Sequence, residues 1–219
     1  MNEKKNLTIN ETFAIAVQNH RKNNLKVAQN LYKKILKTNP NYVGVYYNLG
    51  ITYKELEEYQ KAIGCYEKVI QIDPNYAQAH LNLGIVFKES EELQKAISCF
   101  QKAIHIQPNY ADAHNNLGLT FKELQEYQKA ISCYEKAIQI DPNYANVYYN
   151  LGNILQELRE MQKAKSCYEK LLNLDPTYKK GYSSYGYLLL KISQHNKGLA
   201  YIRKGDGVIR FTQKDVKII

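Results

Sequence analysis

Apolar residues recur along the chain at the spacing of one face of an α-helix. In residues 77–110 they form two groups, first Leu83, Val86 and Phe87, and then Ala96, Ile97, Phe100, Ala103 and Ile104. This spacing predicts two consecutive helices of about 12–14 residues each. The polar stretch 89–92 marks the turn between them. Pro108 ends the second helix because proline has no backbone N–H and clashes with the preceding turn. The predicted unit is therefore an α-helical hairpin.

The hairpin pattern repeats with a step of 34 residues. All five prolines follow this step, at Pro40, Pro74, Pro108, Pro142 and Pro176. Five glycines and four cysteines keep it too, at Gly50, Gly84, Gly118, Gly152, Gly186, Cys65, Cys99, Cys133 and Cys167. A fixed period of this size is typical of stacked repeat proteins, in which each repeat packs only on its neighbours. The predicted fold class is an all-α solenoid of about six helical hairpins.

The repeat pattern divides the chain into units. Four well-matched units are predicted at 43–76, 77–110, 111–144 and 145–178, and degenerate units flank them at 9–42 and 179–204. Residues 1–8 are expected to be disordered or to cap the first helix, because Thr8 and Glu11 have the spacing of a capping box. The tail 205–219 contains glycines and two β-rich runs, and it is expected to be irregular or β-like.

Small residues are expected to let the helices approach closely. Glycine inside a helix costs roughly 0.5–1 kcal/mol relative to alanine, so its recurrence at one register indicates tight packing. We expect Gly84 to face Ala96 across the hairpin, with aromatic rings filling the space around them. Asn109 is expected to cap the helix that follows the proline.

The repeated pattern resembles the tetratricopeptide repeat (TPR), a helix–turn–helix unit of 34 residues. In 77–110 the matching residues are His80, Leu83, Gly84, Phe87, Ala96, Phe100, Ala103 and Pro108. The chain has no tryptophan, and tyrosine or histidine stands in its place. The resemblance implies a right-handed α–α superhelix, whose first helices line a concave groove.

The resemblance also places particular residues of each unit in that groove. The sixth place is Asn48, Asn82, Asn116 and Asn150, the fifth is Tyr47, Leu81, Asn115 and Tyr149, and the twelfth includes Lys88 and Lys122. An amide side chain both donates and accepts hydrogen bonds, so the asparagine row could bind the backbone of an extended peptide. It is similar to the asparagine ladder of O-linked N-acetylglucosamine transferases. The alternative, which the sequence leaves open, is that these asparagines are solvated or bond within their own hairpins.

The sequence offers little catalytic or metal-binding chemistry. The four cysteines occupy the same place in separate repeats, too far apart for a disulfide, and no Cys-x-x-Cys pair indicates zinc. We expect them to pack between helices. No glycine-rich phosphate loop is found, and no nucleophile stands out beside a base. The chain is therefore predicted to be non-catalytic, with no cofactor and no metal.

The charge and hydropathy of the chain limit the kinds of partner that it is expected to bind. The formal net charge is +9, with basic ends and mildly acidic central repeats. A nucleic-acid-binding repeat protein would carry a continuous basic stripe, so this distribution argues against nucleic acid. No apolar run is long enough for a membrane span. The start MNEKKNLTINE lacks the apolar stretch of a secretory signal, so a cytoplasmic location is predicted. The degenerate ends leave room for self-association.

Two functions follow from these features. The first is a non-catalytic interaction scaffold whose groove holds a peptide or helix of a partner protein. The alternative is an accessory or substrate-recruiting repeat module of a glycosyltransferase-type enzyme system, since similar arrays precede transferase domains in larger proteins. A nucleic-acid adaptor is favoured only by the basic isoelectric point.

Overall fold

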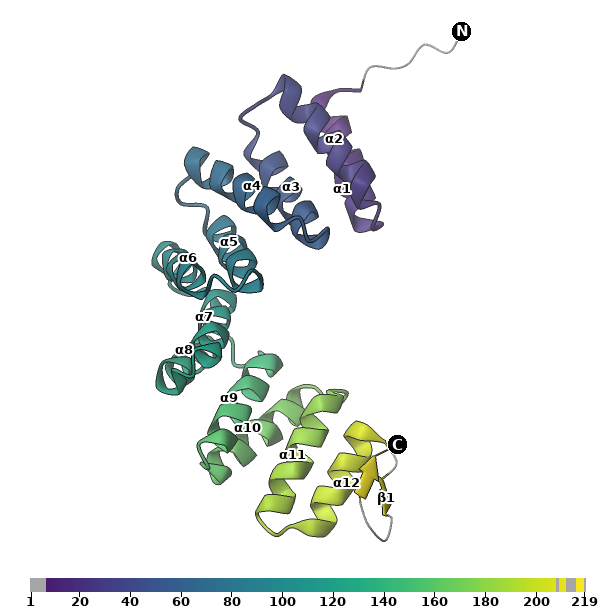
Figure 1. Ribbon diagram of the computed structural model, residues 1–219, viewed down its shortest axis with the longest axis vertical. Coiled ribbons are helices and arrows are strands. Elements are labelled where there is room, and N and C mark those ends of the chain that lie inside the picture. Colours follow the sequence, from purple (N-terminus) through teal and green to yellow (C-terminus); the bar gives the residue numbers. More distant parts are fainter. Residues whose placement is uncertain (1–6, 208, 212–215, 219) are drawn as a thin grey trace. The chain divides into compact units, whose positions relative to one another are not determined.

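The described part of the chain is built from α-helical hairpins. The computed structural model describes residues 7–207, 209–211 and 216–218, and these residues form twelve α-helices, paired as six consecutive hairpins (Figure 1). The chain divides into two compact units, Met1–Asn109 and Tyr110–Ile219. Each unit stacks three hairpins, which confirms the predicted all-helical solenoid.

The helices of the two units follow the same pattern. Unit 1 contains α1 (Ile9–Arg21), α2 (Leu25–Thr38), α3 (Val43–Glu55), α4 (Tyr59–Ile72), α5 (Ala77–Glu89) and α6 (Leu93–Ile106). Unit 2 contains α7 (Ala111–Glu123), α8 (Tyr127–Ile140), α9 (Ala145–Glu157), α10 (Met161–Leu174), α11 (Lys179–Lys191) and α12 (His195–Asp206). Within each unit every helix contacts the next one along the chain. The first helices also contact one another, α1 with α3 and α3 with α5 in unit 1, and α7 with α9 and α9 with α11 in unit 2.

Two short strands follow the last helix. They are β1 (Ile209–Phe211) and β2 (Val216–Ile218), paired antiparallel with Ile209 opposite Ile218. Residues 1–6 of the predicted N-terminal segment, and residues 208, 212–215 and 219 of the predicted tail, lie outside the described residues. The capping box at the start of α1 is confirmed. The Thr8 N–H donates to Glu11 Oε2 at 2.8 Å, and the Glu11 N–H donates to Thr8 Oγ1 at 3.2 Å.

A close contact between a glycine and an aromatic ring joins the two helices of a hairpin. A β-carbon added at Gly84 would lie 2.6 Å from a ring atom of Phe100, closer than such atoms approach in proteins. The three atoms nearest to this β-carbon all belong to Phe100, because the ring of α6 reaches across to the backbone of α5. The same contact recurs between Gly50 and Tyr66, Gly118 and Tyr134, and Gly152 and Tyr168. The predicted contact of Gly84 with Ala96 stays a prediction, and in the last hairpin the equivalent residues Gly186 and Gly198 do lie close together.

The prediction that Asn109 caps the next helix is wrong. The N-cap of α7 is Tyr110, which makes no side-chain cap bond, and Tyr144 has the same place before α9. The asparagine belongs instead to the turn that follows each second helix. With 9–42 counted as repeat 1 and 43–76 as repeat 2, the equivalent turn of repeat 4 (111–144) is held by the Asn143 N–H, which donates to Asp141 Oδ1 at 2.9 Å. This bond is an Asx-type turn, which replaces a helix cap at the same point of the chain.

Every hairpin turn contains a residue in the left-handed conformation. Glu91 has a φ of 62°, its N–H donates to the Lys88 carbonyl, and the next N–H donates to the Phe87 carbonyl. These two bonds form a Schellman motif, in which glycine is the usual residue. None of the six residues at this place is glycine; they are Asn23, Glu57, Glu91, Gln125, Arg159 and Ser193. A β-carbon costs roughly 1–2 kcal/mol in this conformation.

The second helices of repeats 1 to 5 each bury one aromatic ring, and the hydrogen bonding of these rings differs between repeats. Tyr32, Tyr66, Tyr134 and Tyr168 are fully buried, and Phe100 takes this place in repeat 3. Among the described residues, the hydroxyls of Tyr32, Tyr66 and Tyr134 have no hydrogen-bond partner. The Tyr168 hydroxyl instead donates to Asn153 Oδ1 at 2.8 Å. Burial raises the pKa of Tyr32 to about 12, because ionisation would place a charge in the core.

Glycine at the left-handed turn position is expected to stabilise the chain. Gln125→Gly and Glu91→Gly should each raise the free energy of unfolding by about 0.5–1 kcal/mol, because glycine adopts this conformation without steric cost. Urea denaturation followed by circular dichroism measures the change. Asn23→Gly is the matched control and should change stability little, since asparagine already tolerates this conformation. Equal effects at all three positions would contradict the explanation.

The buried tyrosines provide a second test. Tyr66→Phe and Tyr134→Phe should leave stability unchanged or raise it by up to about 1 kcal/mol, because each removes a buried hydroxyl without a partner. Tyr168→Phe should lower stability by about 1 kcal/mol, since it breaks the bond to Asn153. Thermal and urea denaturation of the three variants measure this difference. A loss of the same size in all three would show that the hydroxyls of Tyr66 and Tyr134 do have partners in solution.

Candidate functional site

The asparagine row predicted from the sequence is distributed over the first helices of both units. Asn48 and Asn82 lie on α3 and α5 of unit 1, and Asn116 and Asn150 lie on α7 and α9 of unit 2. All four are half-buried. They share one register because each first helix begins at the same point of the 34-residue period.

Two of these asparagines bond to their own helix. Asn48 Nδ2 donates to the Gly44 carbonyl oxygen at 2.7 Å, and Asn116 Nδ2 donates to the Asp112 carbonyl oxygen at 2.8 Å. Each acceptor lies one turn earlier on the same helix. These bonds fix the amide orientation without joining the asparagine to another repeat.

The other two asparagines join neighbouring first helices within a unit. Asn82 Nδ2 donates to the Tyr47 hydroxyl at 3.0 Å, and Asn150 Nδ2 donates to Asn115 Oδ1 at 3.2 Å. In all four asparagines the nitrogen is thus engaged inside the protein. Among the described residues, no donor bonds to the side-chain oxygen of any of the four. The oxygens are therefore the groups that remain available to a ligand.

The fifth-place residues differ in accessibility. Leu81 and Asn115 are each 7% exposed, so they offer a ligand little surface, contrary to the groove position expected for them. They are buried because this side of the first helix packs against the neighbouring repeat. Tyr47 and Tyr149 are half-buried. Their rings lie 5.2 Å from Tyr76 and 5.3 Å from Tyr178, between ring centroids.

Lysines and apolar residues complete this face. Lys88 and Lys122 are half-buried near the C-terminal ends of α5 and α7, and each directly precedes a glutamate. The ninth place, which the resemblance also assigns to the groove, lies one turn after each asparagine. We call these positions together the first-helix face: Tyr47, Asn48 and Ile51 on α3, Asn82, Ile85 and Lys88 on α5, Asn116, Leu119 and Lys122 on α7, and Tyr149, Asn150 and Asn153 on α9.

The ninth place adds apolar side chains to this face. Ile51, Ile85 and Leu119 are half-buried and lie three residues after the asparagine, on the same side of the helix. Its signal in the sequence is an apolar residue that repeats every 34 positions on an otherwise polar side of the helix. The first-helix face therefore alternates amide and apolar side chains, which suits contact with a peptide backbone and its side chains together.

The cysteines do not behave as nucleophiles. All four are free thiols, and burial raises the pKa of Cys65 to about 12 and those of the other three to about 11. A thiol with such a pKa stays protonated at neutral pH and is unreactive. Within residues 7–207 and the two strands, no three His, Cys, Asp or Glu side chains are grouped so as to hold a metal ion. No described helix combines the length and the apolar character needed to cross a membrane.

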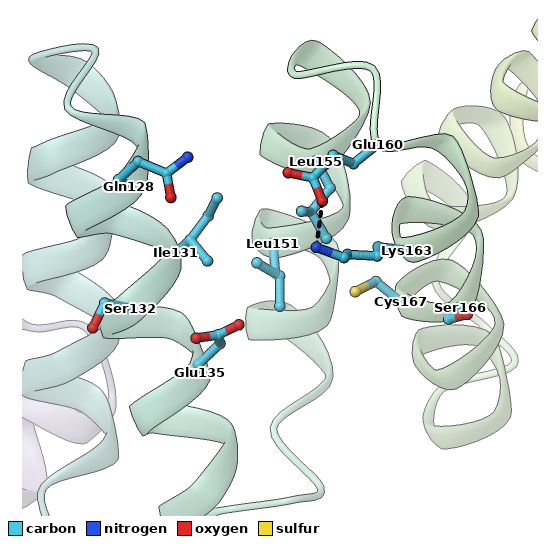
Figure 2. Close-up of a pocket in the computed structure, with 10 residues that line it drawn as sticks. All are labelled: Gln128, Ile131, Ser132, Glu135, Leu151, Leu155, Glu160, Lys163, Ser166 and Cys167. Atoms are coloured by element: carbon cyan, nitrogen blue, oxygen red, sulfur yellow. Dashed lines mark ion pairs between the residues drawn. The ribbon is translucent and has the colours of Figure 1, made fainter.

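A pocket of about 540 Å³ lies elsewhere in unit 2 (Figure 2). Side chains of α8 and α10 form its walls, and Leu151 and Leu155 of α9 line it between them. The full lining is Gln128, Ile131, Ser132, Glu135, Leu151, Leu155, Glu160, Lys163, Ser166 and Cys167. Neither leucine belongs to the first-helix face, so the pocket is a separate surface. It was not predicted from the sequence.

The two kinds of asparagine bond predict different effects on stability. Asn82→Ala should lower the free energy of unfolding by about 1 kcal/mol, because it removes the bond to Tyr47 that joins α3 to α5. Asn116→Ala is the matched control. It should change stability by less, since alanine favours the helix and the lost bond lies within one helix. Urea denaturation of both variants measures the difference, and equal losses would contradict the bridging role of Asn82.

Comparison with known proteins identifies the repeats. Family models described as TPR repeat match residues 86–125 and 120–158, and models described as tetratricopeptide repeat match 43–76, 65–98 and 145–178. A crystal structure of MamA is 32% identical, with a TM-score of 0.68, and the match covers 74% of this chain and 95% of that one. No curated protein matches the chain.

More distant structures share the fold. PilF of Pseudomonas aeruginosa is 17% identical with a TM-score of 0.79, covering 88% of each chain. YrrB, described as a TPR protein with an unusual peptide-binding site, is 20% identical with a TM-score of 0.64, covering 80% of this chain and 90% of that one. The repeat matches and the identity to MamA agree with the residue pattern and with the six hairpins. The chain belongs to the tetratricopeptide-repeat family.

Proposed function

We propose that the chain is a non-catalytic protein–protein interaction scaffold, and that the first-helix face of each unit binds a peptide or helix of a partner protein. The observation that carries this proposal is the state of the asparagine row. Each unit presents two side-chain oxygens on neighbouring first helices, with the amide nitrogens already bonded inside the protein.

The bonded nitrogens give the row a defined chemistry. An amide oxygen accepts hydrogen bonds and has two lone pairs. Because each nitrogen is turned towards a carbonyl, a hydroxyl or another amide of the protein, the oxygen is left to accept N–H groups from outside. An extended peptide presents its own backbone N–H groups at regular intervals. The proposed row therefore reads the peptide backbone, through acceptors only, and tolerates variation in peptide sequence.

The rest of the first-helix face supplies contact area. In unit 1, Ile51 and Ile85 flank the asparagines, and the ring of Tyr47 is half-buried beside them. Aromatic and apolar groups dominate the binding energy of peptide grooves, while polar groups fix orientation. The description of YrrB as a protein with a peptide-binding site fits the same use of this fold.

A non-catalytic role and a cytoplasmic location are parts of the same proposal. The protonated, half-buried thiols argue against a cysteine nucleophile. Four free thiols are usual in a reducing compartment. The alternative, an accessory module of a glycosyltransferase-type system, rests only on the resemblance of the asparagine row, and no observation of the described residues favours it.

Selection of a synthetic ligand tests the proposal. Peptides selected from a random library on the full chain are synthesised, and their affinities are measured by isothermal titration calorimetry. Asn48→Ala and Asn116→Ala are the preferred variants, because their lost bonds lie within one helix and the packing between repeats is kept. Each should weaken a selected peptide by about 2–10-fold, the value of one hydrogen bond.

Two controls make the result specific. Asn173→Ala changes an exposed asparagine on the second helix α10 and should leave affinity unchanged. N-methylation of one peptide N–H at a time should weaken binding to the wild-type chain, and in each alanine variant the methylation at one of these positions should lose its effect. Unchanged affinity in Asn48→Ala and Asn116→Ala would reject the first-helix face as the binding surface.

A further inference from the structure

Repeats 2 to 4 share a buried ring covered by a lysine. The ring is the eleventh residue of each repeat, Tyr53, Phe87 and Phe121, and each is at most 8% exposed. A lysine of the following helix lies over it, with Nζ 5.6 Å, 5.2 Å and 5.3 Å from the ring centroid, for Lys61, Lys95 and Lys129 in turn. Such contacts between a cation and an aromatic face are attractive.

Repeat 5 keeps the lysine but has lost the ring. Leu155 occupies the eleventh place, and Lys163 is the corresponding lysine. The Lys163 side chain is 73% exposed, compared with 61%, 62% and 63% for its three counterparts. The lysine is therefore present in repeat 5 without the aromatic surface that it covers in the other repeats.

The pocket of Figure 2 lies where the ring is missing. It is lined by Leu155 and Lys163, and across it by Ile131 of α8. In unit 1 the residue equivalent to Ile131 is Ile63, which is 8% exposed, and the next hairpin there carries the ring of Phe87. Ile131 itself is only half-buried. Leu151 and Leu155 line the other side of the pocket and are 7% and 5% exposed, so the apolar surface that stays uncovered belongs to Ile131.

The rim of the pocket carries an excess of negative charge. Glu160 pairs with Lys163, as the dashed line in Figure 2 marks. Glu135 stands on the opposite wall, and it forms no ion pair within the described part of the chain. A ligand that brings a positive charge beside an apolar group would complement this arrangement.

We propose that this pocket binds a phenylalanine or tyrosine side chain of a partner protein that has a lysine or arginine next to it. The incoming ring would contact Ile131, Leu151 and Leu155 and would lie beneath Lys163, restoring the contact that repeats 2 to 4 make internally. The neighbouring basic residue would pair with Glu135. This site and the first-helix face share no residues, so an experiment can reject one of the two proposals without affecting the other.

The probe is a set of blocked tetrapeptides titrated into the isotope-labelled full chain and followed by NMR. Acetyl-Gly-Phe-Lys-Gly-amide should shift the amide signals of Ile131, Leu155 and Lys163, with a dissociation constant in the millimolar range. The same peptide with Leu in place of Phe, or with Glu in place of Lys, should bind more weakly. Equal shifts with all three peptides, or no shifts at these residues with the Phe-Lys peptide, would overturn the proposal.

Two variants connect the binding to the pocket. Leu155→Phe introduces the ring found in the sister repeats and should abolish the shifts. Glu135→Lys changes only the rim, so folding is not at risk, and it should weaken the Phe-Lys peptide by about threefold or more while strengthening the Phe-Glu peptide. Unchanged binding in both variants would overturn the proposal.

The chain itself contains a basic residue beside a ring, at Arg210 and Phe211. Analytical ultracentrifugation of the wild type and of Leu155→Phe distinguishes this occupant from a separate partner. We expect the wild type and Leu155→Phe to sediment with the same coefficient. Dimerisation that Leu155→Phe removes would mean that a second copy fills the pocket, and the proposed partner would then be wrong.

Discussion

The four hairpins from α3–α4 to α9–α10 each depend on the contact between a glycine of the first helix and an aromatic ring of the second helix. A β-carbon at the glycine would overlap the ring, for example at 2.6 Å between Gly84 and Phe100. Glycine is costly inside a helix, and the close approach of the two backbones offsets this cost by burying the whole ring. Since the ring is the largest buried side chain of its helix, the spacing of the two helices follows from this one contact.

Because the repeats share this framework, their differences are informative. Repeat 5 departs at the ninth, eleventh and twelfth places, with Asn153, Leu155 and Gln156 where repeats 2 to 4 carry apolar, aromatic and lysine side chains. Asn153 and Gln156 give the buried Tyr168 hydroxyl the partners that Tyr66 and Tyr134 lack. Leu155 opens the pocket beside Lys163. In repeat 5 the buried tyrosine hydroxyl therefore has hydrogen-bond partners, and the aromatic ring of the eleventh place is missing.

The two candidate binding surfaces differ in the groups that they offer to a ligand. The first-helix face presents side-chain oxygens whose amide nitrogens are held by the protein, and such acceptors recognise backbone groups without selecting a sequence. The pocket between α8 and α10 combines apolar side chains with polar and charged ones, so it would select one type of side chain. A scaffold with both surfaces would accept many peptide sequences at the first-helix face and would select one type of side chain at the pocket.

The sequence alone determined the repeat, the helical hairpins, the capping box at Thr8 and the absence of cysteine pairing, because each follows from local spacing along the chain. It did not determine which atoms meet across the hairpin. The sequence suggests Asn109 as a helix cap, whereas tertiary packing places it in a turn. Only the packed structure shows that the ring of Phe100 reaches the backbone at Gly84. Leu81 and Asn115 share the register of Tyr47, yet only the packed structure shows that they are buried. The pocket beside Leu155 likewise depends on side chains from three helices, and the volume left by a missing ring is a property of their packing and not of any local pattern.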